Sequence, residues 1–368
     1  MLKSPYLPVF ELIRGETVES IHYGAIAVVD ISGDLIAWYG DPEAVTFLRS
    51  SAKPFQALPF LEHGGQAAFD LTPREIALIC ASHSGTDEHV AVVQAIQVKT
   101  GVTEAELLCG VHSPAHEPTA EKMRERNELP TPNRHNCSGK HTGMLAFTRL
   151  LELSSEQVGE NITYIDPRHP VQQEILHTFA QMCELPVEQV ALGTDGCSAP
   201  NFAVPLKNAA LAYARLSDPE MGRVEPPERA AACRAITSAM IFNPDMVGGP
   251  GRFDTRLMEV GRGRMVVKGG AEGYQGVGLM PGALSPGSPA IGIALKISDG
   301  DPKGRARPAV TLEVLRRLGA LSDADLDLLG EFGPELPVLN WRKLGVGEGH
   351  PSFELELKSD NVSQNREV

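Results

Sequence analysis

Three short stretches of the chain carry serine and lysine side chains that could act together as nucleophile and base. The first, SSAK, begins at Ser50 and ends at Lys53, so on a helix the two side chains would share one face. A serine hydroxyl is a weak nucleophile alone, and a lysine activates it only if burial or nearby cations lower the lysine pKa. Because a capping serine beside a solvated lysine gives the same spacing, this motif alone is weak evidence for an active site.

The other two stretches follow apolar runs. Ser82 opens the polar turn SHSG directly after IALICA, and Lys268 follows MVV and precedes Gly269 and Gly270. A lysine in an apolar strand is costly to bury without a partner, and the glycines would let a ligand approach the backbone closely. The alternatives are a helix-ending turn for the first stretch and a solvent-facing lysine for the second.

The order of the three motifs is more informative than any one of them. Serine hydrolases of the penicillin-recognising type use S-x-x-K, then a serine-bearing turn, then a K-[TS]-G strand. This chain carries SSAK, CASHSG and VVKGG in the same order. The combination predicts two serines and two lysines converging on one acyl carbon.

A fourth candidate is a pair of cysteines, Cys137 in CSGKH and Cys197 in DGCSA. Thiolates are strong zinc ligands, but two cysteines leave the site incomplete. His141 is the conventional third ligand, whereas Lys140 could bind only as the neutral amine. The alternative is that both cysteines are simply buried thiols.

The hydrophobic pattern predicts strands near both ends of the chain, with helices and loops between them. Residues 24–30 and 34–40 read as one hairpin, and residues 265–273 and 290–300 as another. Helical patterns cover 50–63, 87–101, 169–185 and 307–321, and a further helix follows Gly143. Residues 72–85 predict a helix whose C-terminal end breaks into a polar turn. We therefore expect an α/β (α+β) layered fold, in which the terminal strands share one central, antiparallel-rich sheet flanked by helices.

Composition excludes several classes of function. The chain has 368 residues and a net charge of −14, which disfavours nucleic-acid and anionic-membrane partners. Prolines and charges interrupt the N-terminal segment, so it does not read as a signal peptide, and no stretch approaches the ~20 apolar residues needed to span a bilayer.

The six cysteines of the chain are scattered along its length, which favours reduced thiols or metal ligands over disulfides. We expect a cytoplasmic protein.

Several long blocks of this sequence together resemble the Rhizobium-type, or class 3, L-asparaginases. The resemblance runs from about residue 7 to about residue 350. The matching blocks, in chain order, are VESIHYGAIAVVD (18–30), RSSAKPFQALP (49–59), CASHSGTDEH (80–89), NCSGKHTGML (136–145), HPVQQEI (169–175), GTDGCSAPNFAVPL (193–206) and VVKGGAEG (266–273).

The resemblance implies a fold similar to the serine β-lactamases and glutaminases, and a set of site residues. It implies two Ser–Lys tandems, Ser50 with Lys53 and Ser82 with Lys268. It also implies a Zn²⁺ ion held by Cys137, Lys140 and Cys197, with Lys140 in place of the conventional histidine. The substrate-binding residues would be Arg49, His141, Asp195 and Gly269, of which Asp195 would orient metal-bound water.

The expected function is hydrolysis of L-asparagine to L-aspartate and ammonia by a single domain over residues 1–350, or two closely packed subdomains. A partly disordered tail would cover 351–368, and the common state of similar proteins suggests a homodimer. Two alternatives remain open. One is a glutaminase or other serine amidohydrolase on the same scaffold, since one methylene changes binding by only about 1–3 kcal/mol. The other is a zinc-dependent amino-acid binding protein without catalysis.

Overall fold

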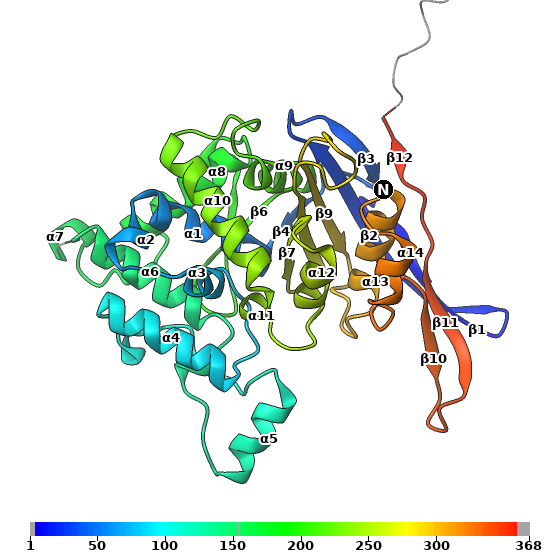
Figure 1. The fold of residues 1–368 in the computed structure, drawn as a ribbon, viewed down its shortest axis with the longest axis horizontal. Helices are drawn as coiled ribbons and strands as arrows, with labels where there is room; N and C mark the ends of the chain where they lie inside the picture. Colours follow the sequence, from blue (N-terminus) through cyan, green and yellow to red (C-terminus); the bar gives the residue numbers. More distant parts are fainter. Residues whose placement is uncertain (1–3, 154, 359–368) are drawn as a thin grey trace, which may run out of the picture.

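The longest strand, β2 (Thr17–Asp30), organises the central sheet of this computed structural model, which describes residues 4–153 and 155–358 (Figure 1). Every neighbouring pair of strands in the sheet is antiparallel. The main path runs β10 (Leu336–Leu339), β11 (Gly345–Pro351), β1 (Leu7–Arg14), β2, β9 (Ile291–Ile297), β8 (Tyr274–Leu279) and β7 (Met265–Gly270). The second half of β2 also pairs with β3 (Leu35–Tyr39), which in turn pairs with β12 (Glu356–Leu357).

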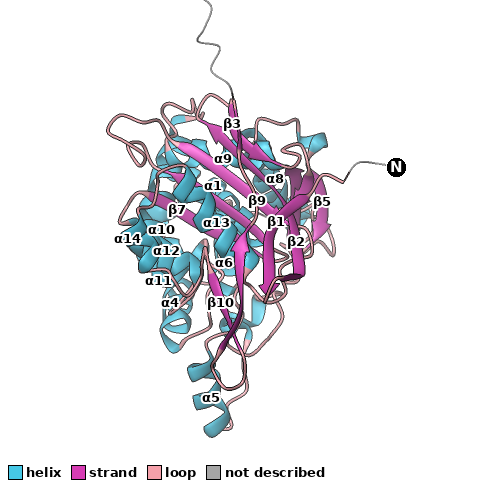
Figure 2. Cartoon of the chain, turned by 90° about the vertical axis from the view of Figure 1, so that its right-hand side faces the viewer, coloured by secondary structure: helices cyan, strands magenta, loops and turns pink. Residues whose placement is uncertain are grey.

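Helices cover both faces of this sheet, so β8 and β9 are buried along their whole length. On one face α9 (Leu206–Ser217) packs so closely that added Cβ atoms at Gly276 and Gly292 would overlap it. On the other face Gln275, which points the opposite way along β8, contacts Arg307 of α13 (Ala306–Arg317). Figure 2 shows the strands running side by side across the molecule.

A group of helices lies beside the β7 edge of the sheet. At its centre is α1 (Lys53–Glu62), whose residues from Lys53 to Leu61 are all buried against neighbouring helices. Its neighbours are α3 (Pro73–Ile79), α6 (Ser138–Leu150), α8 (Pro170–Met182) and α10 (Pro227–Phe242). The remaining helices are α2 (Gly65–Ala68), α4 (Asp87–Thr100), α5 (Glu117–Glu125), α7 (Ser155–Val158), α11 (Pro244–Val247), α12 (Phe253–Gly261) and α14 (Asp323–Asp327).

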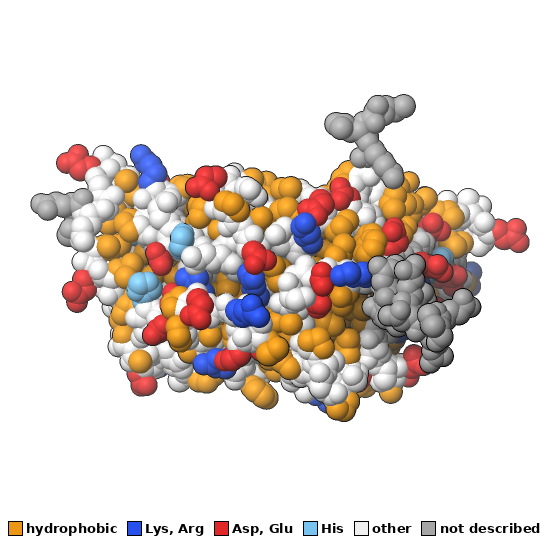
Figure 3. Space-filling view, turned by 90° about the horizontal axis from the view of Figure 1, so that it is seen from above, with side chains coloured by type: hydrophobic (Ala, Val, Ile, Leu, Met, Phe, Trp, Pro, Cys, Tyr) orange, Lys and Arg blue, Asp and Glu red, His pale blue; other side chains and the backbone are white. Residues whose placement is uncertain are grey.

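Shorter elements complete the fold. A small antiparallel sheet has the order β4 (Val45–Phe47), β6 (Pro200–Pro205) and β5 (Ala191–Thr194). The 3₁₀ turns are η1 (Arg49–Ala52), η2 (Glu104–Glu106), η3 (Pro132–Arg134) and η4 (Val187–Gln189). None of the helices described has the length and apolar composition needed to traverse a lipid bilayer. On the face seen in Figure 3, acidic and basic side chains lie interspersed.

The layered, antiparallel-rich fold class and the hairpin over 24–40 are confirmed. The prediction that 290–300 is the hairpin partner of 265–273 is wrong, because β8 lies between β7 and β9 and pairs with both. Residues 274–279 read YQGVGL, and their glycines weaken the strand signal while making room for α9. Of the predicted tail, β12 pairs with β3, and positions 359–368 lie outside the described residues.

The helix predicted after Gly143 begins earlier, at Ser138. The glycines that made this stretch look like a loop are contact points within the helix. A Cβ added at Gly139 would lie 2.3 Å from the Leu78 carbonyl oxygen, and one at Gly143 would lie 2.7 Å from Ile79 Cγ2. Residues 138–141 of the CSGKH motif therefore lie on α6, with Cys137 directly before it, and Gly139 contacts α3.

Candidate active site

Three segments distant in sequence meet at the junction of the sheet and the helical region. They are η1 with the start of α1, the turn that follows α3, and the end of β7. A pocket of about 170 Å³ opens between them. Its lining consists of Ser50, Ser82, Asn136, Gly248, Arg252, Phe253, Asp254, Lys268, Gly269, Gly270, Ala271 and Arg307.

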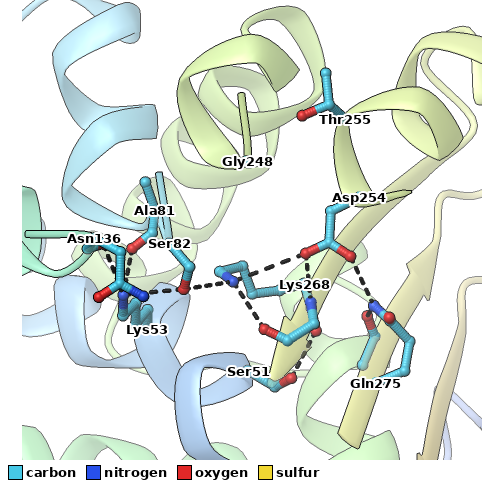
Figure 4. Close-up of polar contacts among 12 residues, drawn as sticks. Ser51, Lys53, Ala81, Ser82, Asn136, Gly248, Asp254, Thr255, Lys268 and Gln275 are labelled. Atoms are coloured by element: carbon cyan, nitrogen blue, oxygen red, sulfur yellow. Dashed lines mark hydrogen bonds and ion pairs between the residues drawn. The ribbon is translucent and has the colours of Figure 1, made fainter. Parts of the chain in front are cut away.

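Ser82 lies between two buried lysines (Figure 4). Lys53 Nζ and Lys268 Nζ each donate a hydrogen bond to Ser82 Oγ, and both N···O distances are 3.0 Å. Lys53 also donates to the carbonyl oxygen of Asn136 at 3.3 Å, and Lys268 donates to that of Gly269 at 2.9 Å. The result is a continuous hydrogen-bonded chain from α1 through Ser82 to β7.

The environment of Lys268 favours its neutral amine. Burial lowers the pKa of Lys268 to about 7, and the nearby positive charge of Lys53 acts in the same direction, while Asp254 opposes both. The side chain of Lys268 is 1% exposed. A lysine with a pKa near neutrality can accept and return a proton at physiological pH, which an ordinary surface lysine cannot do.

Ser50 and Ser51 are neighbours in the sequence, but they face different surroundings. Ser50 is half-buried and lines the pocket. Ser51 is fully buried and donates from Oγ to the Lys268 carbonyl oxygen at 2.6 Å. Within the described residues, no hydrogen bond joins Ser50 Oγ to Lys53 Nζ, so the structure links Lys53 to Ser82 rather than to Ser50.

Arg49 sets the direction in which the chain enters η1. Its φ is 52°, a left-handed value that strains a residue with a side chain. Two contacts hold it there: its N–H donates to Asn201 Oδ1 at 3.1 Å, and its Nε donates to Asp195 Oδ1 at 2.7 Å. Arg49 and Asp195 therefore form an ion pair with each other beside the pocket, and neither belongs to the pocket lining.

Gly269 and Gly270 are close contact points at the end of β7. Gly269 N–H donates to Asp254 Oδ2 at 2.7 Å, so this donor is already engaged and is not free for a substrate oxyanion. A Cβ at Gly269 would lie 2.5 Å from a guanidinium nitrogen of Arg307, and one at Gly270 would lie 2.3 Å from the Leu48 carbonyl oxygen. Gly270 therefore requires glycine, because it meets a backbone atom, whereas a side chain at Gly269 would displace the guanidinium group of Arg307.

The predicted metal ligands lie on a second, buried side of the site. Lys140 Nζ donates to Cys197 Sγ at 3.0 Å, and Cys137, Lys140 and Cys197 are each at most 4% exposed. A hydrogen bond with Cys197, together with the nearby charges of Lys53 and Lys140, holds the pKa of Cys137 well below its usual value. Two sulfurs and an amine are thus close together, although no group of three or more His, Cys, Asp or Glu among the described residues could hold a metal ion.

His141 is adjacent to this cluster and is fully buried. Its Nδ1 is paired with the Tyr164 hydroxyl at 2.7 Å, and its Nε2 has no hydrogen-bond partner among the described residues. Burial lowers the pKa of His141 to about 4, so the ring is neutral at physiological pH. An unpaired nitrogen beside two thiols and an amine fits a site that a metal ion and its bound water would complete.

The sequence did not single out several residues of the pocket. Asp254, Arg252 and Arg307 line it, and Asn136 contributes a carbonyl oxygen to Lys53. Asp254 lies in the first turn of α12, where acidic residues are common for reasons of helix electrostatics. No local sequence signal separates such an aspartate from one that belongs to an active site.

The chain is similar to several solved structures over most of its length. Among solved structures it is similar to a probable glutaminase from Bacillus subtilis complexed with 6-diazo-5-oxo-L-norleucine, with 15% identity, 80% of this chain and 84% of that chain covered, and a TM-score of 0.36. It is also similar to a Bacillus glutaminase in 4.3 M NaCl, with 13% identity, coverages of 80% and 90%, and a TM-score of 0.35.

A search of the curated proteins finds no match. The family model described as L-asparaginase II matches residues 10–351, a range that contains every motif described above. The chain therefore belongs to the L-asparaginase II family.

Proposed function

We propose that this protein hydrolyses L-asparagine to L-aspartate and ammonia. Membership of the L-asparaginase II family supports amidohydrolase activity. The observation that carries the proposal further is the hydrogen-bonded chain from Lys53 through Ser82 to Lys268, beside a pocket that Ser50 lines. Acyl transfer needs a nucleophile that the substrate can reach and nearby groups that can move its proton. Ser50 would be the nucleophile, and the buried lysines with Ser82 would move the proton.

In the proposed first step, Ser50 Oγ attacks the side-chain amide carbon of asparagine. Lys53, three residues further along the chain, first passes its own proton through Ser82 to the neutral amine of Lys268 and then accepts the hydroxyl proton. Ser82 and Lys268 pass a proton to the amide nitrogen, so that the carbon–nitrogen bond breaks and ammonia leaves. Water then hydrolyses the β-aspartyl ester, which releases aspartate and restores the Ser50 hydroxyl.

The pocket suits a small amino acid. Arg252 lines it and offers a guanidinium group to the α-carboxylate. Because Gly269 N–H is bonded to Asp254, the oxyanion donors would come from other backbone N–H groups near the pocket, and Gly270 and Ala271 line it. Arg49 and Asp195 form an ion pair beside the pocket. From this position they would help to bind the substrate.

A zinc ion is part of the proposal. Cys137, Lys140 and Cys197 would hold it, with Lys140 binding as the neutral amine, and the unpaired Nε2 of His141 would face its coordination shell. The ion would act as a Lewis acid or a positioning charge near the substrate. The residues of the chain themselves bind the substrate and move the protons. We also propose that the protein is a homodimer, which is the common state of similar proteins.

Ammonia release measured in a coupled assay tests the function. We expect release from L-asparagine, with a higher kcat/KM than for L-glutamine. Release from glutamine alone would assign the protein as a glutaminase. Asparagine binding by calorimetry, with no release from either amide, would favour a binding protein.

A further inference from the structure

Asp254 lies on the side of Lys268 away from Ser82 and is not part of the Ser–Lys pairs (Figure 4). We propose that Asp254 is a positioning residue, whose carboxylate fixes the end of β7 and holds Lys268 against Ser82. The inference rests on the proposed function, since it concerns a residue that acts through Lys268 in the same reaction. Three observations carry it: the contacts of the carboxylate, the anchoring of the β7 backbone, and the charge around Lys268.

The carboxylate of Asp254 has a partner on each oxygen. Oδ2 accepts the N–H of Gly269 at 2.7 Å and lies 3.8 Å from Lys268 Nζ. Oδ1 accepts from Gln275 Nε2 at 3.4 Å and lies 3.6 Å from a guanidinium nitrogen of Arg307. Arg307 is itself hydrogen-bonded to Gln275 and lies over the Phe253 ring. Groups from α12, β7, β8 and α13 therefore determine where this carboxylate lies.

Side chains anchor both polar groups of the peptide unit that joins Lys268 to Gly269. Its carbonyl oxygen accepts from Ser51 Oγ at 2.6 Å, and the next N–H, that of Gly269, donates to Asp254. The lysine side chain leaves β7 directly before this anchored peptide group and reaches Ser82 Oγ at 3.0 Å. Loss of the Asp254 anchor would therefore allow the reactive amine to move relative to Ser82. A displacement of about 1 Å in an active site can reduce the rate by about 100-fold.

Asp254 also supplies the negative charge that faces Lys268. Its side chain is 13% exposed, and burial alone would raise its pKa. The charges of Lys268 and Arg307 and the N–H of Gly269 outweigh burial, so the pKa of Asp254 is lowered and the group is ionised. This charge raises the pKa of Lys268 against burial and neighbouring cations. The titratable or charged groups around Lys268 are Asp254, Lys53, Arg252, Arg307 and Cys80.

Three substitutions separate the charge from the anchor. Asp254→Asn keeps an oxygen that can accept from Gly269 but removes the charge, so the acid limb of the kcat/KM profile should move down by about one pH unit. Asp254→Ala removes both, and kcat should fall by up to about 100-fold with a smaller change in KM. Asp254→Glu keeps the charge, so the acid limb should stay at the wild-type position.

The matched control is Asp325→Asn. Asp325 is also a buried carboxylate in an ion pair with an arginine, Arg264 at 3.0 Å, and it completes the capping box of Ser322 at the start of α14, outside the pocket. This variant should lose stability without a change in the acid limb. If Asp254→Asn behaved in the same way, with an unmoved acid limb, Asp254 would be a structural residue and the proposal would be overturned.

A second readout does not depend on asparagine turnover. Protein labelled with ¹³C at lysine Cε reports the titration of Lys268 by NMR, with the signal assigned through Lys268→Arg. We expect a lower midpoint in Asp254→Asn than in wild type, and an unchanged midpoint in Asp325→Asn. Equal midpoints in wild type and Asp254→Asn would overturn the inference. Absence of ammonia release by wild type would instead reject the proposed function, and the NMR comparison would still decide the role of Asp254.

Discussion

At the scale of single residues, the site depends on a hydroxyl shared by two lysines. Ser82 Oγ accepts from Lys53 and Lys268, and Ser50 lines the pocket beside them. Two ammonium groups this close would repel each other, so the arrangement favours a neutral amine at one of them. Burial places that amine at Lys268, whose pKa is lowered to about 7.

Ser50→Ala should abolish turnover and leave the fold intact. Ser50 is only half-buried, and its hydroxyl makes no hydrogen bond within the described residues, so little packing is lost. Loss of an essential nucleophile typically reduces kcat by at least about a thousandfold. Steady-state ammonia release and a thermal melt measure the two effects, with the exposed Ser298→Ala as control. Retention of more than about a tenth of the activity, a loss near 1.4 kcal/mol in barrier, would reject Ser50 as the nucleophile.

The pH dependence of kcat/KM should follow the neutral fraction of Lys268. Since its pKa is lowered to about 7, the amine is mostly protonated at pH 6 and mostly neutral at pH 8. If the neutral amine moves the proton, kcat/KM rises across this interval and then levels off. A profile measured from pH 6 to 10 checks this. A flat profile would remove the argument for a lysine base.

Substitution of Lys268 should separate its chemistry from its packing. Lys268→Met keeps the apolar stem and should reduce kcat by about 100-fold or more with little loss of thermal stability, because burying a charged amine is itself unfavourable. Lys268→Arg should be nearly as inactive, because arginine stays protonated. Lys296→Met, which changes another buried lysine of the same sheet, is the control and should retain kcat. Near-normal kcat in Lys268→Arg would limit Lys268 to an electrostatic role.

At the scale of elements, the position of α6 depends on two glycines that face α3. Gly139 and Gly143 allow the helix to lie against Leu78 and Ile79, which brings Lys140 to Cys197. The same contact orders the segment that carries Asn136, whose carbonyl oxygen holds Lys53. Close helix packing and the geometry of the pocket are therefore linked through one element.

Gly139→Ala should lower the free energy of unfolding. Its new Cβ would lie 2.3 Å from the Leu78 carbonyl oxygen, a backbone atom that cannot move without shifting α3. Overpacking of this kind typically costs about 1–3 kcal/mol. Denaturant unfolding measures it. Gly345→Ala, where no atom lies within 4 Å of the added Cβ, is the matched control and should unfold like wild type. Equal unfolding of the two variants would contradict the packing argument.

At the scale of the whole molecule, the proposed zinc site joins separate parts of the chain. Cys137 immediately precedes α6, whereas Cys197 lies in the turn between β5 and β6, and both sulfurs reach the same buried region. Arg49 connects that turn to the start of η1 through its ion pair with Asp195. The small sheet, the helical region and the pocket are therefore in contact through this cluster.

Purified protein should contain about one zinc ion per chain, since thiolates are its preferred protein ligands. Cys137→Ser should lose most of this metal. Cys233→Ser, which changes a buried cysteine of α10, should retain it. Elemental analysis of protein prepared without chelators measures both. Metal-free wild type, or equal zinc in the two variants, would leave Cys137 and Cys197 as ordinary buried thiols.

The sequence by itself determined the family, the layered fold class and the motifs that meet at the pocket. These features depend on short-range patterns: serine and lysine three residues apart, glycines after a buried lysine, and apolar strands near both ends of the chain. Local periodicity also predicted the helices over 72–85 and 87–101, where capping boxes at Thr72 and Thr86 begin α3 and α4.

Only the tertiary structure decided which side chains touch. Lys53 contacts Ser82, and Ser51 faces the β7 backbone whereas Ser50 faces the pocket. Strand β8 lies between β7 and β9, and Asp254 lies 3.8 Å from Lys268. Each of these contacts joins residues whose relation depends on strand order or helix packing. The glycines of α6 and β8 are typical of loops in the local sequence, yet in the structure they allow a neighbouring helix to approach closely. Such close approaches depend on the neighbouring element, which local sequence does not specify.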